Sequence, residues 1–222
     1  MGEMIRFKRP DAKDCSGYYV KPASGDKAPA LVVIQEWWGL NDQIKGVAER
    51  FAGLGYRALV PDLYRGKLTV EREEADHLMS NLDFGDAAKQ DIAGAVQHLG
   101  KGGAKVGVVG FCMGGALTVL SAAFVKGLAA ASSWYGFPPE GAADVTKIKI
   151  PIQFHFASKD AFFTPEAARM LEARLEAGKV KFESWWYPAN HAFGNEKSEN
   201  YDAVAAKLAW QRTLDFLAKY LK

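Results

Sequence analysis

The chain has 222 residues, of which 49% are hydrophobic and 24% charged, and its formal net charge at pH 7 is +2. This composition predicts one well-buried core, and the interspersed charges argue against a nucleic-acid-binding surface. The nearest approach to a basic cluster is Arg6, Lys8 and Arg9, which we expect to be solvated surface charge. No N-terminal segment resembles a signal peptide and no apolar run approaches the length of a membrane span, so we expect no membrane partner.

The length suits a single domain over residues 1–222, which we expect to act as a monomer on a small molecule. Its two cysteines, Cys15 and Cys112, are far apart and form no CxxC pair. This spacing argues against a disulfide framework and against a zinc site, so we expect neither a metal nor a cofactor. The natural setting for two free thiols is the reducing cytoplasm, where a thiol can remain a nucleophile.

Runs of apolar residues and helical periodicities predict the secondary structure along the chain. The expected strands, in chain order, cover residues 5–9, 17–21, 30–34, 56–60, 104–109, 128–134, 151–157 and 180–187. The expected helices cover residues 41–54, 70–82, 85–99, 116–125, 164–178 and 201–220. Asn41 or Asp42 and Thr164 are the expected caps at the starts of two of these helices. Strands that alternate with helices predict an α/β fold with a mostly parallel central sheet and helices on both faces.

The hexapeptide Gly-Phe-Cys-Met-Gly-Gly at 110–115 lies between a predicted strand and a predicted helix. A strand that enters a helix through G-x-C-x-G is the nucleophile-elbow arrangement, with cysteine in place of serine. Glycine is needed at Gly110 and Gly114 because a Cβ would clash where the strand and helix backbones nearly touch. The N–H groups and the dipole at the start of the helix favour a thiolate at Cys112. Taken alone, the hexapeptide could also hold an inert, buried cysteine in a glycine-rich turn.

Two further side chains follow predicted strands at the same edge of the sheet. Asp160 comes after the strand 151–157, and His191 comes after the strand 180–187. Ligands of parallel sheets collect beyond the carboxyl ends of the strands. The order Cys112, Asp160, His191 is the nucleophile, acid, histidine order of the α/β-hydrolases. In such a triad the histidine moves protons, and the acid orients the ring and stabilises the imidazolium.

Each partner of the cysteine has an alternative interpretation. Asp160 lies in Ser-Lys-Asp, which is ordinary turn composition. The other three histidines are His77 and His98, which we expect in helices, and His155, which we expect to be a hydrogen-bonded core residue inside a strand. His191 is therefore the histidine that follows a strand in a loop at the expected edge. The agreement of three positions in one chain order is stronger than any of them alone.

The elbow also predicts where a negatively charged oxygen would be stabilised during acyl transfer. One donor is the backbone N–H of Met113, the residue after the nucleophile. The second comes from the loop after the strand 30–34, and we expect it to be the N–H of Trp37.

Several segments of the chain resemble the dienelactone hydrolases (carboxymethylenebutenolidases). They are the elbow, Gln-Glu-Trp-Trp-Gly-Leu-Asn at 35–41, Pro-Asp-Leu-Tyr at 61–64 and His-Ala-Phe-Gly at 191–194, within a similarity that spans residues 5–220. The resemblance implies the α/β-hydrolase fold and hydrolysis of a dienelactone to maleylacetate. It also implies that Glu36 contacts the resting thiol and accepts its proton when substrate binds. Arg72 matches a family arginine that pairs with the substrate carboxylate. The alternative is that Arg72 is a solvated helix arginine, because most arginines on helices are exposed.

The chain departs from the family pattern in its expected substrate contacts. The dienelactone enzymes carry a second arginine four residues after the histidine, where this chain has Asn195. Asp76 and Met79 stand where the best-known members have aromatic residues. These changes weaken the expected recognition of an anionic dienelactone. Six aromatic residues are expected to line the pocket, although core packing explains some of them equally well: Trp37, Trp38, Tyr135, Phe162, Phe163 and Phe193. Of these, Trp38, Tyr135 and Phe193 are expected to contact the substrate.

We therefore expect a hydrolase that cleaves a lactone or small ester through a thioester at Cys112. One alternative is a broader carboxylesterase or lactonase that acts on a substrate other than dienelactone. Two less favoured alternatives are a non-catalytic ligand-binding protein on the same fold and a thiol-redox protein. A redox role would be expected to need a resolving cysteine, and nothing in the sequence places Cys15 near Cys112.

Overall fold

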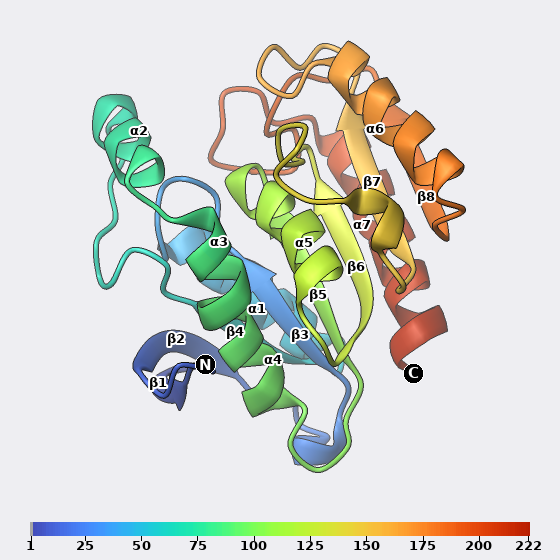
Figure 1. The fold of residues 1–222 in the computed structure, drawn as a ribbon. Coiled ribbons are helices and arrows are strands. Elements are labelled where there is room, and N and C mark those ends of the chain that lie inside the picture. The colour runs from blue at the N-terminus through green and yellow to red at the C-terminus, as the bar shows by residue number, and fades with distance from the viewer. Residues whose placement is uncertain (1) are drawn as a thin grey trace.

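The computed structural model describes residues 2–222, which form one eight-stranded sheet in the order β1-β2-β4-β3-β5-β6-β7-β8 (Figure 1). The strands are β1 Glu3–Lys8, β2 Asp14–Val20, β3 Ala30–Ile34, β4 Arg57–Pro61, β5 Val106–Phe111, β6 Leu128–Trp134, β7 Ile152–Ala157 and β8 Phe182–Tyr187. The pairs β1–β2 and β2–β4 are antiparallel, and the pairs from β4 through β3 to β8 are parallel. The predicted mostly parallel sheet is confirmed.

Helices cover both faces of the sheet. They are α1 Asp42–Gly53, α2 Arg72–Ser80, α3 Phe84–Asp86, η2 Ala87–Ile92, α4 Ala93–Leu99, α5 Met113–Phe124, α6 Pro165–Ala177 and α7 Ala203–Leu221, with short 3₁₀ turns η1 Gly25–Lys27 and η3 Val145–Lys147. The core on one face packs α1 and α7 against Leu31 and Val33 of β3. The core on the other face packs α4, α5 and α6 against Val32 and Ile34. All of β3 is buried for this reason, as expected for a strand covered on both sides.

Two helix starts have the predicted caps. The Asn41 side chain accepts a hydrogen bond from the N–H of Ile44 at the start of α1. At the start of α6, Thr164 accepts from the N–H of Ala167, and proline occupies the first turn. These caps satisfy N–H groups that have no partner inside the helix.

The helix after the elbow begins earlier than the sequence pattern predicts. It was expected at 116–125, whereas α5 starts at Met113 and includes two glycines. A Cβ at Gly114 would come within 2.5 Å of the Gln35 carbonyl oxygen, and one at Gly115 within 2.8 Å of Ser133 Oγ. Close packing therefore requires glycine inside this helix, although glycine disfavours a helix by intrinsic propensity.

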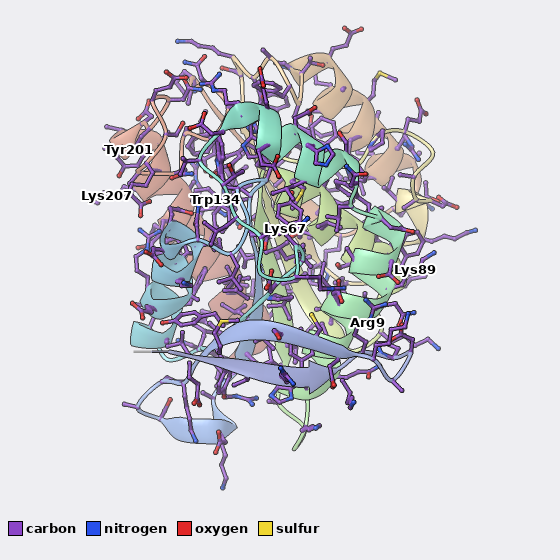
Figure 2. The ribbon with its side chains drawn as sticks, turned by 90° about the vertical axis from the view of Figure 1, so that its left-hand side faces the viewer. Arg9, Lys67, Lys89, Trp134, Tyr201 and Lys207 are labelled. Atoms are coloured by element: carbon purple, nitrogen blue, oxygen red, sulfur yellow. The ribbon has the colours of Figure 1, made fainter. Side chains whose placement is uncertain are left out.

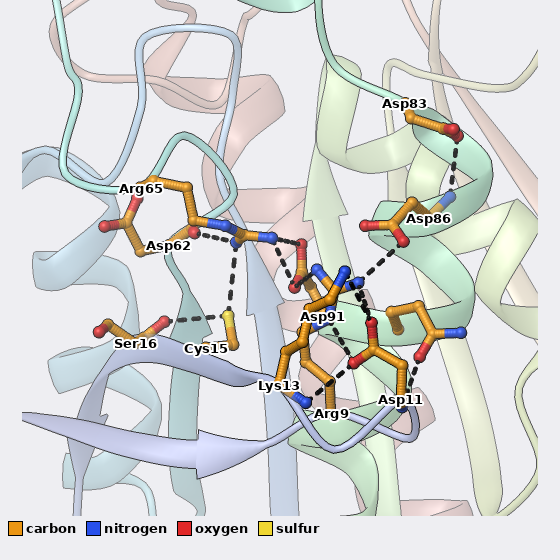
Figure 3. A network of polar contacts seen from close by, with 11 residues as sticks. Arg9, Asp11, Lys13, Cys15, Ser16, Asp62, Arg65, Asp83, Asp86 and Asp91 are labelled. Carbon is orange, nitrogen blue, oxygen red and sulfur yellow. Dashed lines mark hydrogen bonds and ion pairs between the residues drawn. The ribbon is translucent and has the colours of Figure 1, made fainter.

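A network of ion pairs joins the N-terminal hairpin to the helix of residues 84–99, which contains the π-helical segment η2 (Figure 3). Asp91 of η2 is 3.1 Å from Arg9 Nη1 and 2.9 Å from Arg65 Nη2. Arg9 also pairs with Asp86 at 2.8 Å. The expectation that Arg9 is solvated surface charge is wrong, because its side chain is 6% exposed and packed among carboxylates. Cys15, on β2, receives a weak contact from Arg65 Nη1 at 3.6 Å.

Within the described part of the chain, no helix is long and apolar enough to cross a membrane. Large aromatic side chains fill much of the interior. Figure 2 shows Trp134 inside the molecule, whereas Tyr201 and Lys207 lie on its outside. His155 is fully buried and hydrogen-bonds to Tyr187 and Gln153, which confirms the prediction that it is a core residue.

Candidate active site

The site lies at the topological switch point of the sheet, where successive strands are added on opposite sides of β3. β3 pairs with β4 on one side and with β5 on the other, and Ile34 is aligned with Gly110 in the parallel register. The loops that follow β3 and β5 therefore start side by side at the carboxyl edge of the sheet. Glu36 lies on the first loop and Cys112 on the second. Such a reversal leaves a crevice in which ligands of α/β folds bind.

Cys112 occupies the sharp turn between β5 and α5. Its backbone has φ 55° and ψ −119°, a conformation that a residue with a side chain rarely adopts. A Cβ at Gly110 would come within 2.1 Å of the Gly114 carbonyl oxygen, and one at Gly136 within 2.0 Å of the Cys112 carbonyl oxygen. The surrounding backbone thus leaves room for glycine alone, which confirms the steric reason predicted for Gly110.

The structure brings Cys112, Asp160 and His191 together. His191 Nε2 lies 3.1 Å from Cys112 Sγ, and His191 Nδ1 lies 2.8 Å from Asp160 Oδ2. The three residues come from the ends of β5, β7 and β8, as their positions after predicted strands suggested. The arrangement can pass a proton between the thiol and the ring while the carboxylate holds the ring in place.

Asp160 is fixed by the loop that it begins. Its side chain is 1% exposed, and its Oδ1 accepts hydrogen bonds of 2.9 Å from the N–H groups of Phe162 and Phe163. The rings of these two residues flank His191, with centroids 5.2 Å and 5.5 Å from the imidazole. The turn interpretation of Asp160 is thus also correct, because one oxygen closes the turn and the other faces the histidine.

The electrostatics of the site favour a protonated imidazole. Burial by itself would lower the pKa of His191, but the hydrogen bonds to Asp160 and Cys112 outweigh it and raise the pKa to about 10. A proton on both ring nitrogens allows His191 to donate to the carboxylate and to the sulfur at once.

Glu36 is arranged differently from the expectation. Its Oε1 accepts a hydrogen bond of 3.1 Å from Tyr135 Oη, and its Oε2 accepts one of 2.7 Å from Asn195 Nδ2. The hydrogen-bond partner of the thiol is His191, so the implied contact of Glu36 with the resting thiol is not present. Burial raises the pKa of Glu36, with the hydrogen bonds from Asn195 and Tyr135 opposing the rise.

The expected oxyanion donors both border the cavity in front of the thiol. Met113 is the first residue of α5, where an N–H has no acceptor inside the helix. Trp37 follows Glu36 in the loop after β3, and its ring lies against that of Trp38 with centroids 5.0 Å apart.

A cavity of about 560 Å³ opens in front of Cys112, and both Arg72 and Trp38 line it, as expected. Arg72 is paired with Glu199, whose Oε1 lies 2.5 Å from Arg72 Nη2, and both side chains are largely exposed. Two of the expected substrate contacts are wrong: Tyr135 and Phe193 are fully buried and do not line the cavity. Tyr135 is directed to Glu36, and Phe193 is packed between the Trp134 and Tyr187 rings.

Other residues of the site were missed. By sequence Asn195 is only a missing arginine, yet its side chain is buried and donates a hydrogen bond to Glu36. Lys197 and Glu199 line the cavity from the loop between β8 and α7. The sequence signal for these residues is the polar run that follows His191, and such a run does not indicate which side chains point into the cavity. Among residues 2–222, no group of three or more His, Cys, Asp or Glu side chains is arranged to hold a metal ion.

The chain is similar to known proteins over most of its length. The profile of the dienelactone hydrolase family matches residues 15–221. The chain is 35% identical to the protein usf of Aquifex pyrophilus over 233 residues, covering 100% of both chains. It is 33% identical to carboxymethylenebutenolidase 1 of Cupriavidus pinatubonensis over 216 residues, covering 91% of each.

Among solved structures, a dienelactone hydrolase-like promiscuous phosphotriesterase from metagenomic libraries shares the fold. The TM-score is 0.85 at 24% identity, and the match covers 100% of this chain and 99% of that one. The strand order, the elbow and this likeness establish the predicted α/β-hydrolase fold. The fold and the family profile are those of hydrolases that act on ester and lactone bonds. The chain therefore belongs to the dienelactone hydrolase family.

Proposed function

We propose that the chain hydrolyses a lactone or ester, of the dienelactone-to-maleylacetate type, through a covalent thioester at Cys112. The observation that carries this proposal is the continuous hydrogen-bonded line from sulfur to carboxylate. It runs from Cys112 Sγ to His191 Nε2 at 3.1 Å and from His191 Nδ1 to Asp160 Oδ2 at 2.8 Å, beside a cavity of about 560 Å³.

In the acylation step the Cys112 sulfur attacks the carbonyl carbon of the substrate. A C–S bond forms, and the carbonyl electron pair moves onto oxygen, where the N–H groups of Met113 and Trp37 stabilise it. When the intermediate collapses, the C–O bond breaks and the proton on His191 Nε2 goes to the leaving oxygen. In a lactone that oxygen stays attached to the acyl chain.

In the deacylation step a water takes the place of the leaving group. Part of the rise in the pKa of His191 comes from its interaction with the Cys112 sulfur, and acylation removes that interaction. The ring that has just lost its proton is then a better base for the water. The oxygen of the water attacks the thioester, the C–S bond breaks, and the product acid leaves with the thiolate restored.

The role of Glu36 in this proposal is to position rather than to accept the thiol proton. Both of its oxygens are engaged, with Tyr135 and with Asn195, while the thiol is paired with His191. The Cys112–His191 pair can therefore exchange its proton before any substrate arrives.

The second candidate is a carboxylesterase or lactonase that acts on an uncharged substrate. Two observations favour it over an anionic dienelactone. Asn195, at the position of the family's second arginine, is directed to Glu36, and Arg72 is already paired with Glu199. The chain would act as a monomer on this small molecule, and the need for a free thiol points to the reducing cytoplasm.

The test is turnover of dienelactone and of 4-nitrophenyl esters by the wild type, Cys112→Ala and the control Cys15→Ala. We expect Cys112→Ala to lose at least about 10³-fold in kcat, as for removal of a nucleophile, with Cys15→Ala near wild type. Acid-quenched wild-type protein should gain the mass of one acyl group, and Cys112→Ala should not. Full turnover by Cys112→Ala would exclude the covalent route. A wild type that hydrolyses no ester or lactone would favour the non-catalytic and thiol-redox alternatives.

A further inference from the structure

One ion pair joins two distant segments of the chain at the wall of the cavity. Arg72 is the first residue of α2, and Glu199 lies in the loop that leads to α7. Arg72 Nη2 and Glu199 Oε1 are 2.5 Å apart, although the residues are separated by 127 positions, and both line the cavity. Figure 1 shows α2 at one side of the molecule, and this contact joins its first residue to the loop before α7.

The loop that carries Glu199 has a well-defined backbone. Asn195 donates to Glu36, and its Oδ1 accepts a hydrogen bond of 2.9 Å from the N–H of Lys197. The Ser198 N–H donates to the Asn195 carbonyl oxygen at 2.9 Å, and the Tyr201 N–H donates to that of Ser198 at 3.1 Å. Glu199 is therefore presented toward Arg72 by a loop anchored beside the candidate catalytic residues.

A carboxylate on Arg72 has a direct consequence for substrate choice. A guanidinium binds a carboxylate most strongly with two parallel N–H donors, and Glu199 already occupies one of them, Nη2 of Arg72. A substrate carboxylate must displace Glu199 or bind beside its negative charge. An uncharged ester meets neither cost. Lys197 also lines the cavity, in addition to the candidate catalytic His191, so it is a competing anchor for an anionic substrate.

We propose that Glu199 is a specificity-determining residue that occupies Arg72 and makes the site prefer uncharged esters or lactones over those that carry a carboxylate. The inference rests on the proposed ester hydrolysis, and within it favours the second candidate, an uncharged ester or lactone, over an anionic dienelactone. Glu199 acts through Arg72 and takes no part in bond breaking.

The experiment compares matched substrates. Mono-4-nitrophenyl esters of the dicarboxylic acids from glutarate to suberate carry a terminal carboxylate. Their partners replace that carboxylate with an isopropyl group of the same shape. The measured quantity is the ratio of kcat/KM for the charged ester to that for its uncharged partner, at each chain length. This ratio cancels changes that affect both substrates equally.

Glu199→Gln should raise this ratio about two- to fivefold at the best chain length, because the pair is exposed and such pairs have small energies. The gain should appear as a lower KM for the charged ester, with little change in kcat. It should vanish in Arg72→Gln/Glu199→Gln. The control Glu196→Gln removes the same charge from the same loop, where Glu196 contacts Gln43 instead, and should leave the ratio unchanged.

The outcomes separate the two proposals. If the wild type hydrolyses neither member of a pair, ester hydrolysis itself fails. If it hydrolyses the uncharged ester but Glu199→Gln leaves the ratio at the wild-type value, the role of Glu199 is refuted. An equal effect of Glu196→Gln, or a gain that persists without Arg72, would also refute it. So would a charged-ester KM that depends on Lys197 and not on Arg72.

Discussion

Replacing Asp160 with asparagine tests the electrostatic part of the site without disturbing its loop. The asparagine Oδ1 can still accept the hydrogen bonds that Phe162 and Phe163 donate to Asp160 Oδ1. The group that faces His191 Nδ1 then becomes an amide, which can only donate. The ring must turn that nitrogen into an acceptor and carry its proton on Nε2, toward Cys112, so it can no longer take the thiol proton.

The size of the effect follows from the pKa of His191. Its rise from 6.5 to about 10 corresponds to roughly 5 kcal/mol in favour of the imidazolium, supplied by Asp160 and Cys112 against the cost of burial. If Asp160 supplies between about half and nearly all of this, kcat falls by about 10²- to 10⁴-fold. KM should change little, because Asp160 is buried behind the histidine and does not line the cavity.

The assay is steady-state hydrolysis of a 4-nitrophenyl ester, with thermal unfolding to confirm that Asp160→Asn is folded. Nitrogen NMR of labelled histidine should show the tautomer change at His191 and a pKa well below 10. Retention of more than about a tenth of wild-type kcat, in a folded variant whose His191 pKa has fallen, would refute the assigned role of Asp160.

Three further measurements test the fold and its charges. Because the pKa of His191 is raised to about 10, its protonation stabilises the fold fully below pH 6.5, and this contribution is lost as the pH rises toward 10. The midpoint of urea unfolding should therefore fall between pH 6.5 and about 10, and it should fall more in the wild type than in His191→Gln. Gly110→Ala would put a methyl group 2.1 Å from a carbonyl oxygen, so it should lower the free energy of unfolding by more than about 3 kcal/mol or prevent folding. The control Gly46→Ala lies in open space on α1 and should stabilise the protein by about 0.5–1 kcal/mol in thermal unfolding. Similar effects of the two substitutions would contradict the steric account of the elbow. Asp91→Asn leaves buried Arg9 without one of its charged partners, so the free energy of unfolding in urea should fall by about 3 kcal/mol. The control Asp14→Asn removes an exposed pair with Lys8 and should lower it by less than about 1 kcal/mol. Equal losses of stability would mean that burial of the network is unimportant.

The features that could be predicted are those that depend on neighbouring residues in the sequence. The buried run of β3, the caps of α1 and α6, and the side chains that follow β7 and β8 all depend on residues near one another in the chain. Parallel strands then place their carboxyl ends at one edge, so Cys112, Asp160 and His191 meet without further information.

The parts that could not be predicted depend on contacts between distant loops. Glu36 and Asn195 are 159 residues apart, and nothing near either one indicates that they bond. Tyr135 resembled a cavity residue by type and position, but its hydroxyl is needed by Glu36 and therefore is directed inward. Arg9 resembled a surface cation because its three carboxylate partners lie at Asp11, Asp86 and Asp91 rather than in a recognisable motif.

The pairing of the Cys112 thiol with His191 also affects the chemical lifetime of the protein. Sulfur that has an imidazole 3.1 Å away, at the wall of an open cavity, is available to iodoacetamide or peroxide whenever substrate is absent. Cys15 is protected, because burial raises the pKa of its thiol to about 12. A stoichiometric alkylating agent should therefore label one cysteine and leave the other. Storage of the purified protein will require a reductant, and substrate or a slowly released product should slow its inactivation.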